Sequence, residues 1–377
     1  MASTSPILAL PLELLQQITS EFHGFYSSAD LLALRLVCKQ ISAAVFDQFA
    51  AEYLHRRECF ILDKDRVYNL IDQFNTPTIA RRISKVRVSI EGLNYGPVSQ
   101  IYQAKPNTIR LDRFVNALAR NRCELELDLS CRTEYWYAHR LQWIHDTMDG
   151  VGRAKCKVRR LDLSEHIIPG LSARVTRGSG FMNFLLPLQT LCCDLILSVA
   201  GVVDHIEGLR SIEEIINCVP ALEELELRTL FKSTSRMTYH ASVDRIMVDI
   251  LLATTSRKLS RLHISYGSLE PKIFAEVLQN FEGTLQDFRG NNVGLLSARD
   301  VWTEALRVIS NLPKLRRLSL SNCRQVEGLQ EWDVAMAEHD PTKVCPTWLK
   351  LECIGTHTVR EQIKATLERG LVLRERF

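Results

Sequence analysis

The sequence lacks a secretory signal and an uninterrupted apolar run of membrane length. The opening residues, MASTSPILAL, contain neither a basic stretch nor a long apolar core, so we expect no secretory leader. The longest apolar run, Phe184 to Val203, is interrupted by Pro187 and Asp194. A carboxylate near the middle of a span costs about 3 kcal/mol in lipid. We therefore expect this run to be a buried segment of a soluble protein, with no membrane as a partner.

The chain also lacks a large excess of charge of one sign. Its 377 residues include 47 basic and 44 acidic ones, which gives a net charge of only +3. Charged residues make up 24% and hydrophobic residues 46%, a composition typical of an ordered soluble protein. The length exceeds that of one ordinary compact core, so we expect a small domain joined to a larger one or to a repeat array.

No local motif for catalysis or for a cofactor is present. The glycine pairs Gly150-Val151-Gly152 and Gly178-Ser179-Gly180 lack the spacing of a phosphate-binding or dinucleotide loop, and we interpret both as turns. None of the ten histidines lies in a metal-binding or triad-like local motif. We therefore expect no catalytic residues and no cofactor.

The eleven cysteines do not form a disulfide or zinc pattern. Their number is odd and they are scattered along a long chain, which favours a reducing compartment, the cytoplasm or the nucleus. Cys123 with Cys131, and Cys345 with Cys353, have no nearby Cys or His pair to complete a tetrahedral site, so we expect no metal. We interpret Cys38 as an inert thiol within an apolar helix rather than a nucleophile.

The first sixty residues predict three short helices with more apolar side chains than such a unit can bury. One helix opens after Pro11 and carries Leu14, Leu15 and Ile18 on one face. The second spans the leucines from Leu31 to Val37, and the third covers Ile41 to Leu54. A unit of this size is rarely stable alone, so another surface must cover its leucines. That surface is either the rest of this chain or a second protein.

These residues resemble an F-box. The first part of that motif is matched by Leu10, Pro11, Glu13, Leu14, Leu15 and Ile18, and the second by Asp30, Leu31, Leu34, Val37, Cys38 and Lys39. The spacer from Ile18 to Asp30 is longer than usual in the family, and Ile41 replaces a frequent tryptophan. The resemblance implies docking to the Skp adaptor of a cullin-type ubiquitin ligase. The implied contacts are Leu10, Pro11, Leu14, Ile18, Leu31, Leu34, Val37 and Cys38.

A strand-like pattern recurs through the remaining chain. Segments such as VRRLDLS, LEELELR and LRRLSLS share an apolar spacing, and their second apolar positions recur at intervals of 26 to 37 residues. These positions are Leu161, Leu191, Leu225, Leu262, Phe288 and Leu318. Helix-then-strand units at this spacing resemble degenerate leucine-rich repeats, of the long irregular kind that accompanies many F-boxes, particularly in fungi. Such repeats stack into one core with a parallel sheet.

The predicted fold class is an α/β solenoid, with a three-helix F-box-like bundle followed by an irregular leucine-rich-repeat-like array and a parallel sheet. We divide the chain into an F-box-like helical domain (1–58), a linker with possible first irregular repeats (59–122), a repeat domain (123–355) and a C-terminal capping helix (356–377). The capping helix is expected over Thr358 to Leu371, with Val359, Ile363, Leu367 and Leu371 on one face.

The residue before each second apolar position is expected on the open face of that sheet. The series is Arg160, Thr190, Glu224, Arg261, Asp287 and Arg317, and its charged members are the candidate substrate contacts. Its sign alternates over the last four positions, so we expect a lateral ladder of ion pairs across neighbouring strands. A self-neutralised face weighs against nucleic acid, whose phosphates need a single-sign basic patch.

The predicted function is therefore that of a substrate-recognition subunit of a cullin-type ubiquitin ligase. It would bind the Skp adaptor, and through it the cullin, with its first helices and an unknown protein substrate with its repeats. Two alternatives remain open at this point: an F-box scaffold without a ligase role, and an enzyme whose site is assembled only in space.

Overall fold

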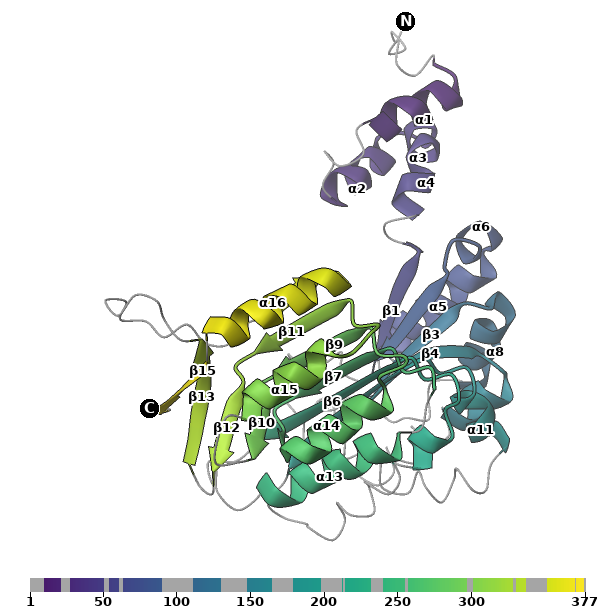
Figure 1. Cartoon of the computed structure of the whole chain (residues 1–377). Coiled ribbons are helices and arrows are strands. Elements are labelled where there is room, and N and C mark those ends of the chain that lie inside the picture. The colour runs from purple at the N-terminus through teal and green to yellow at the C-terminus, as the bar shows by residue number, and fades with distance from the viewer. Residues whose placement is uncertain are drawn as a thin grey trace, which may run out of the picture.

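The structure is a computed structural model of the chain and describes most of its residues. They are residues 10–21, 28–50, 54–60, 64–89, 111–129, 148–164, 179–197, 212, 214–231, 240–254, 257–296, 301–327, 330–336, 351–369 and 371–375. Figure 1 shows a group of short N-terminal helices set apart from a large body in which helices alternate with strands.

The N-terminal group contains four short helices. They are α1 (Leu12–Glu21), α2 (Ser28–Val37), α3 (Lys39–Ala44) and α4 (Phe46–Phe49). Cys38 lies between α2 and α3 and caps α3, because its Sγ accepts a hydrogen bond from the Ile41 N–H at 3.5 Å. The expected inert thiol within a helix is thus a capping residue. Val45 separates α3 from α4, so the helix expected over Ile41 to Leu54 is wrong in its extent.

The main sheet has ten strands. In spatial order they are β1 (Arg56–Phe60), β2 (Lys85–Ser89), β3 (Glu124–Leu129), β4 (Lys157–Ser164), β5 (Thr190–Leu197), β6 (Glu224–Phe231), β7 (Arg261–Ser265), β9 (Asp287–Asn291), β11 (Arg317–Ser321) and β14 (Leu351–Ile354). The first nine strands are parallel, and β14 pairs with β11 in the antiparallel sense. Long strands with alternating apolar residues therefore bury one face and leave the other polar.

Helices connect the strands and pack on the apolar face. They are α5 (Lys64–Asn75), α6 (Pro77–Ala80), α8 (Leu111–Asn121), α11 (Ser179–Leu185), α13 (His240–Ala253), α14 (Pro271–Asn280) and α15 (Val301–Ser310). Figure 1 shows α13, α14 and α15 side by side along the same side of the strands. The six apolar positions that mark the strands in the sequence, Leu161 to Leu318, form one register row and are all buried.

A second sheet of five strands is formed by the segments that come directly after β7, β9 and β11 and by two strands near the end of the sequence. In spatial order it contains β15 (Leu371–Glu375), β13 (Gln330–Met336), β12 (Arg324–Glu327), β10 (Gly294–Leu296) and β8 (Ser268–Leu269). The strands β8, β10 and β12 are parallel, whereas β13 and β15 pair in the antiparallel sense. Helix α16 (Thr356–Arg369) buries Val359 and Ile363 near the last strands of the main sheet.

The predicted fold class is wrong. The structure is an α/β fold with a ten-stranded, mostly parallel sheet, and not a three-helix F-box bundle followed by a repeat array with a single parallel sheet. A second, mixed sheet and an antiparallel edge strand extend the body, and the first helical group has four segments. The apolar spacing marks which residues enter the core, but it does not tell which short segments leave the main sheet to pair elsewhere.

The turns from the main sheet into the second sheet use a left-handed residue. Tyr266, Asn292 and Asn322 have φ values of 61°, 52° and 53° at equivalent places after β7, β9 and β11. Asparagine tolerates this conformation because its short side chain can bond locally. Each such residue is followed by a strand of two to four residues that pairs in the second sheet.

Replacing Asn322 with alanine should lower the free energy of unfolding by about 1 kcal/mol, because alanine in the left-handed region is strained. Urea unfolding of the purified protein measures the change. Asn311→Ala, an exposed position in the turn after α15 without a positive φ, is the matched control and should change stability by less than about 0.5 kcal/mol. Equal effects at both positions would contradict the role assigned to this turn.

Three glycines of the two pairs expected as turns, Gly150, Gly152 and Gly180, lie instead in helical segments, and Gly178 lies outside the described residues. Gly152 belongs to the helical residues 148–153, and Gly180 lies at the start of α11. A Cβ on Gly152 would overlap the carbonyl oxygen of Gly180 and would lie 3.0 Å from the Cβ of Phe184. The turn interpretation is therefore wrong for both residues, because absent side chains here allow close backbone packing.

Candidate functional site

The N-terminal helices carry a group of exposed apolar side chains, which we call the apolar patch. It contains Leu12, Leu14, Ile18, Leu36 and Val37. Leu36 and Val37 are 86% and 63% exposed, and Leu14 is 46% exposed. Leu14 and Ile18 are four positions apart on α1 and so share one side of it, and exposed large apolar side chains are candidates for an interaction site.

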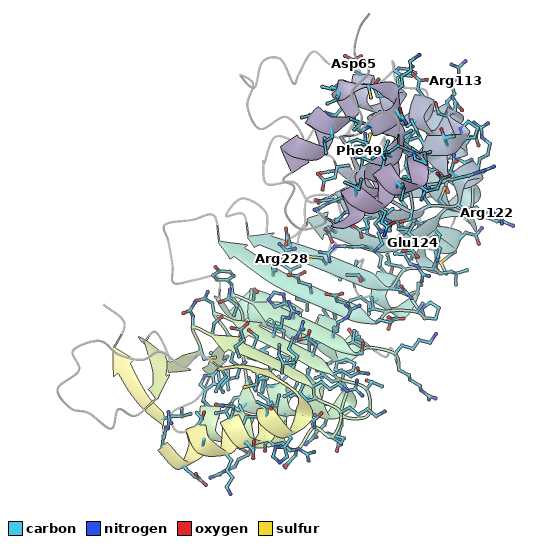
Figure 2. All side chains as sticks on the ribbon, turned by 90° about the horizontal axis from the view of Figure 1, so that it is seen from above. Phe49, Asp65, Arg113, Arg122, Glu124 and Arg228 are labelled. Atoms are coloured by element: carbon cyan, nitrogen blue, oxygen red, sulfur yellow. The ribbon has the colours of Figure 1, made fainter. Side chains whose placement is uncertain are left out.

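A small buried cluster lies in the segment that follows the helices of the patch. Phe49, Ala50 and Leu54 form a buried cluster separate from the main core, and Ile79 of α6 packs against it. The Arg35 guanidinium lies 3.9 Å from the centre of the Phe49 ring, within cation–π distance. Figure 2 shows Phe49 among these helices. The patch residues belong to neither buried cluster.

The candidate adaptor contacts predicted from sequence lie on these helices with differing exposure. Pro11, Leu14, Ile18 and Val37 are exposed, whereas Leu10, Leu34 and Cys38 are half-buried. The side chain of Leu31 lies outside the described residues. The amide of Gln40 donates to the Leu10 carbonyl at 3.0 Å and ties the start of α1 to α3.

Sequence reasoning missed Leu12 and Leu36 as members of the patch. Leu36 lies on a helix that is apolar nearly all round, where spacing alone does not separate the buried side from the exposed one, and Leu12 lies at the start of α1, outside the apolar face expected there. Leu15, a neighbour of Leu14, is buried. The alternative that all the N-terminal leucines pack on the downstream body is wrong for those of the apolar patch, because their side chains are exposed.

The polar face of the main sheet brings the predicted substrate contacts into one row. Arg160, Thr190, Glu224, Arg261, Asp287 and Arg317 are register partners across β4, β5, β6, β7, β9 and β11. The row continues on the other side through Glu126 of β3, Arg87 of β2 and Glu58 of β1. Its charges therefore alternate in sign along the sheet, interrupted at Thr190.

Part of the expected ladder of ion pairs is present. Arg261 lies 3.3 Å from Glu224, and Arg317 lies 3.5 Å from Asp287. Arg160 instead pairs with Asp162 at 2.8 Å and with Glu226 at 3.6 Å, both from the next row. The carboxylates are more buried than the arginines, so guanidinium groups form much of the accessible surface.

Glu226 is the centre of a network that sequence reasoning missed. It lies 2.8 Å from His263 Nδ1 and 3.2 Å from Arg228 Nε, and Arg228 also lies 3.2 Å from Asp194. Burial opposes ionisation of Glu226, but the hydrogen bond from His263 and the charges of Arg228 and Arg160 outweigh it and lower its pKa to about 2. Figure 2 shows Arg228 on the strands of the sheet, well away from Phe49.

Asp162 titrates differently within the same network. Burial raises its pKa to about 6, and the neighbouring Asp128 adds to this shift against the opposing charges of Arg160 and Arg87. Arg87 forms ion pairs with both carboxylates. The pKa of Asp162 in the folded protein is above the ordinary value of 3.8. Between about pH 4 and pH 6 the folded protein therefore holds a proton on Asp162 that the unfolded chain has released.

The buried Asp162 should therefore make the protein less stable as pH rises from about 4 to about 6. A shift of about two pH units corresponds to at most about 3 kcal/mol. Asp162→Asn removes this titration, so the stability difference between the variant and the wild type should change with pH over that window. Urea unfolding at pH 4.5 and pH 7 measures it. A difference that stays constant across both pH values would contradict the assignment.

The described residues offer no evident metal site or membrane helix. Within the described ranges, no three His, Cys, Asp or Glu side chains gather in a way suited to a metal ion. The nine cysteines in those ranges are free thiols, and Cys131 and Cys345 lie outside them. No helix in the described part of the chain combines the length and the apolarity needed to cross a bilayer.

Comparison with known proteins gives no family. No family model matches the sequence, and no curated protein matches it. A solved structure of a sugar phosphate isomerase/epimerase from Parabacteroides distasonis is similar over 84% of this chain and 93% of its own, at 8% identity and a TM-score of 0.23. Similarity at that level supports no conclusion about the fold or the activity of this chain.

Proposed function

We propose that the chain is a substrate-recognition subunit of a cullin-type ubiquitin ligase, acting in the cytoplasm or the nucleus. In this proposal the N-terminal helices bind the Skp adaptor, and the polar face of the main sheet binds a protein substrate. The transfer of ubiquitin is carried out by other subunits. The chain contributes proximity, because binding both partners raises the effective concentration of the substrate near the conjugating enzyme.

The apolar patch is the observation that carries the proposal. Five large apolar side chains stay exposed on α1 and α2, and the same segments match the F-box pattern in sequence. Covering Leu14 and Ile18 with a partner would remove apolar surface from water at about 25 cal/mol per Å². Neither side chain belongs to a buried cluster of the described residues, so both are available to a partner.

The polar sheet face supports the second half of the proposal. Arg160, Glu224, Arg261, Asp287 and Arg317 form a row whose ion pairs hold the arginine side chains in place. Pre-ordered side chains lose less conformational entropy on binding. An alternating row also discriminates between partners, because a segment shifted by one strand would meet like charges.

The test is co-purification of the Skp adaptor with the full-length chain from cells. A paired Leu14→Asp and Ile18→Asp change should reduce captured adaptor at least 100-fold, because two carboxylates would be buried in the interface. Leu186→Asp is the matched control, since Leu186 is 50% exposed and lies after α11. It should leave capture unchanged. The same adaptor yield from both variants would contradict the docking surface.

A scaffold without a ligase role makes a different prediction for the substrate. If the chain recruits substrates to a ligase, the level of at least one bound protein rises when the chain is deleted. That level falls back to normal when the wild-type chain is restored, but not when the paired Asp variant is supplied. Unchanged levels of every bound protein would favour the scaffold.

A further inference from the structure

Ser265, His263 and Glu226 form a hydrogen-bonded chain on the polar face of the main sheet. His263 and Ser265 are two residues apart on β7, so their side chains share a face, and Glu226 of β6 is the register partner of His263. His263 Nδ1 lies 2.8 Å from Glu226 Oε1, and its Nε2 lies 3.0 Å from Ser265 Oγ. The two nitrogens of one imidazole thus face a carboxylate and a hydroxyl.

The ionised state of Glu226 fixes the direction of the proton chain. With its pKa lowered to about 2 by the His263 hydrogen bond and the arginine charges, which outweigh burial, Glu226 is a carboxylate that can only accept hydrogen bonds. His263 Nδ1 therefore carries a hydrogen and donates a hydrogen bond to Glu226. In the neutral imidazole the other nitrogen, Nε2, then has a free lone pair and accepts the hydrogen bond from Ser265 O–H.

This arrangement is the one that activates a serine nucleophile: the hydroxyl bonds to a base, and the base is oriented by a third group. Glu226 is itself fixed by Arg228 at 3.2 Å and Arg160 at 3.6 Å, so the imidazole is held by an anchored carboxylate.

Two polar residues flank Ser265 and can stabilise a developing negative charge. Arg228 and Asn291 are its register partners on β6 and β9. The Asn291 Oδ1 accepts hydrogen bonds from Ser321 Oγ at 2.9 Å and from Asn292 Nδ2 at 3.3 Å, so its amide NH₂ is the donor that it can offer. Donors beside the attacked carbonyl are what an oxyanion requires.

We propose that Ser265, His263 and Glu226 form a hydrolytic site for small carboxylic esters. Ser265 Oγ attacks the ester carbonyl carbon while its proton passes to His263 Nε2. The ester C–O bond breaks, the leaving alcohol takes that proton, and the acyl group remains on Ser265. Water then attacks the acyl-serine with His263 as base, which releases the acid and restores the hydroxyl. Because Ser265 is only 3% exposed, neighbouring side chains must move aside for an ester to reach it, and a small acyl group such as acetyl requires the least movement.

This inference is independent of adaptor docking and goes beyond the proposed function. The test uses the full-length purified chain alone, with p-nitrophenyl acetate as substrate and a fluorophosphonate probe as the covalent label. Ser265→Ala and His263→Gln should each lower the rate of p-nitrophenyl acetate hydrolysis at least 100-fold. Glu226→Gln should lower kcat with KM unchanged, which separates positioning of the imidazole from a loss of substrate binding.

Ser319→Ala is the matched control, because Ser319 lies on the same sheet face in β11 and neighbours Arg289 rather than a histidine on β9. It should keep the wild-type rate. Peptide mass analysis of the labelled wild type should place the phosphonate on Ser265, and this readout holds even if a variant does not fold. A wild-type rate equal to that of Ser265→Ala, an adduct on another residue, or no adduct at all would overturn the proposal.

Discussion

Glu226→Ala is expected to lower the free energy of unfolding by about 3 kcal/mol at pH 7. The side chain is largely buried and lies within 3.6 Å of Arg160, Arg228 and His263, so its loss leaves two half-buried guanidinium groups and the His263 imidazole with fewer partners. Urea unfolding measures the change. Glu352→Ala, an exposed carboxylate on β14, is the control and should change stability by less than about 0.5 kcal/mol.

The pH dependence of the same variant supplies a second check. Because the pKa of Glu226 is lowered to about 2 in the folded protein, its stabilising contribution is present above about pH 4.5 and is lost as pH falls towards 2. The stability difference between Glu226→Ala and the wild type should therefore shrink across that range. A difference that grows on acidification would contradict the network as described.

Gly152→Ala is expected to lower the free energy of unfolding by at least about 3 kcal/mol. The new methyl group would meet the Gly180 backbone, which cannot move aside as a flexible side chain can. The helical residues 148–153 and α11 must then separate, and that opens the core around Phe184. Thermal and urea unfolding of the purified variant measure the loss.

Gly283→Ala is the matched control for this prediction. A Cβ at Gly283 meets nothing within 4 Å, so the same substitution should change stability by less than about 0.5 kcal/mol. Similar stability of Gly152→Ala and the wild type would mean that the two helical segments do not pack through these glycines.

The strands of the main sheet were predictable because their residues alternate. Leu161, Leu191 and Leu225 mark strands whose buried positions and pairing register follow from a two-residue period. The polar row from Arg160 to Arg317 could be placed on one face for the same reason. The four-residue spacing of Val359, Ile363 and Leu367 likewise identifies the C-terminal helix, which lies at Thr356–Arg369, close to its expected bounds.

The fold class could not be obtained from that period. Strands β8, β10 and β12 have two to four residues each, too few to show any alternation, and they leave the main sheet through single left-handed residues such as Asn292. The antiparallel pairing of β14 is likewise a property of the chain path and not of its local pattern. Short elements and their partners are set by tertiary packing, which a spacing rule does not contain.

The candidate sites were predictable only in part for a related reason. The sequence of each strand predicts which of its residues are polar and face the same side. It does not predict the contacts of Glu226 with Arg160 and His263, which join residues 66 and 37 positions apart in the chain. The hydrogen bond between Ser265 and His263 also depends on which imidazole nitrogen faces which strand. In contrast, Leu14 and Ile18 were expected on the surface from the resemblance of their segment to an F-box, and both are exposed.

The measurement that tests the central claim most directly is the binding of purified full-length chain to purified Skp adaptor by titration calorimetry, repeated with the paired Leu14→Asp and Ile18→Asp variant. The account predicts a one-to-one complex with a dissociation constant of about 1 μM or tighter, weakened at least 100-fold by the paired change while Leu186→Asp binds as the wild type does. No binding of the wild-type chain, or equal binding of the paired variant, would contradict it.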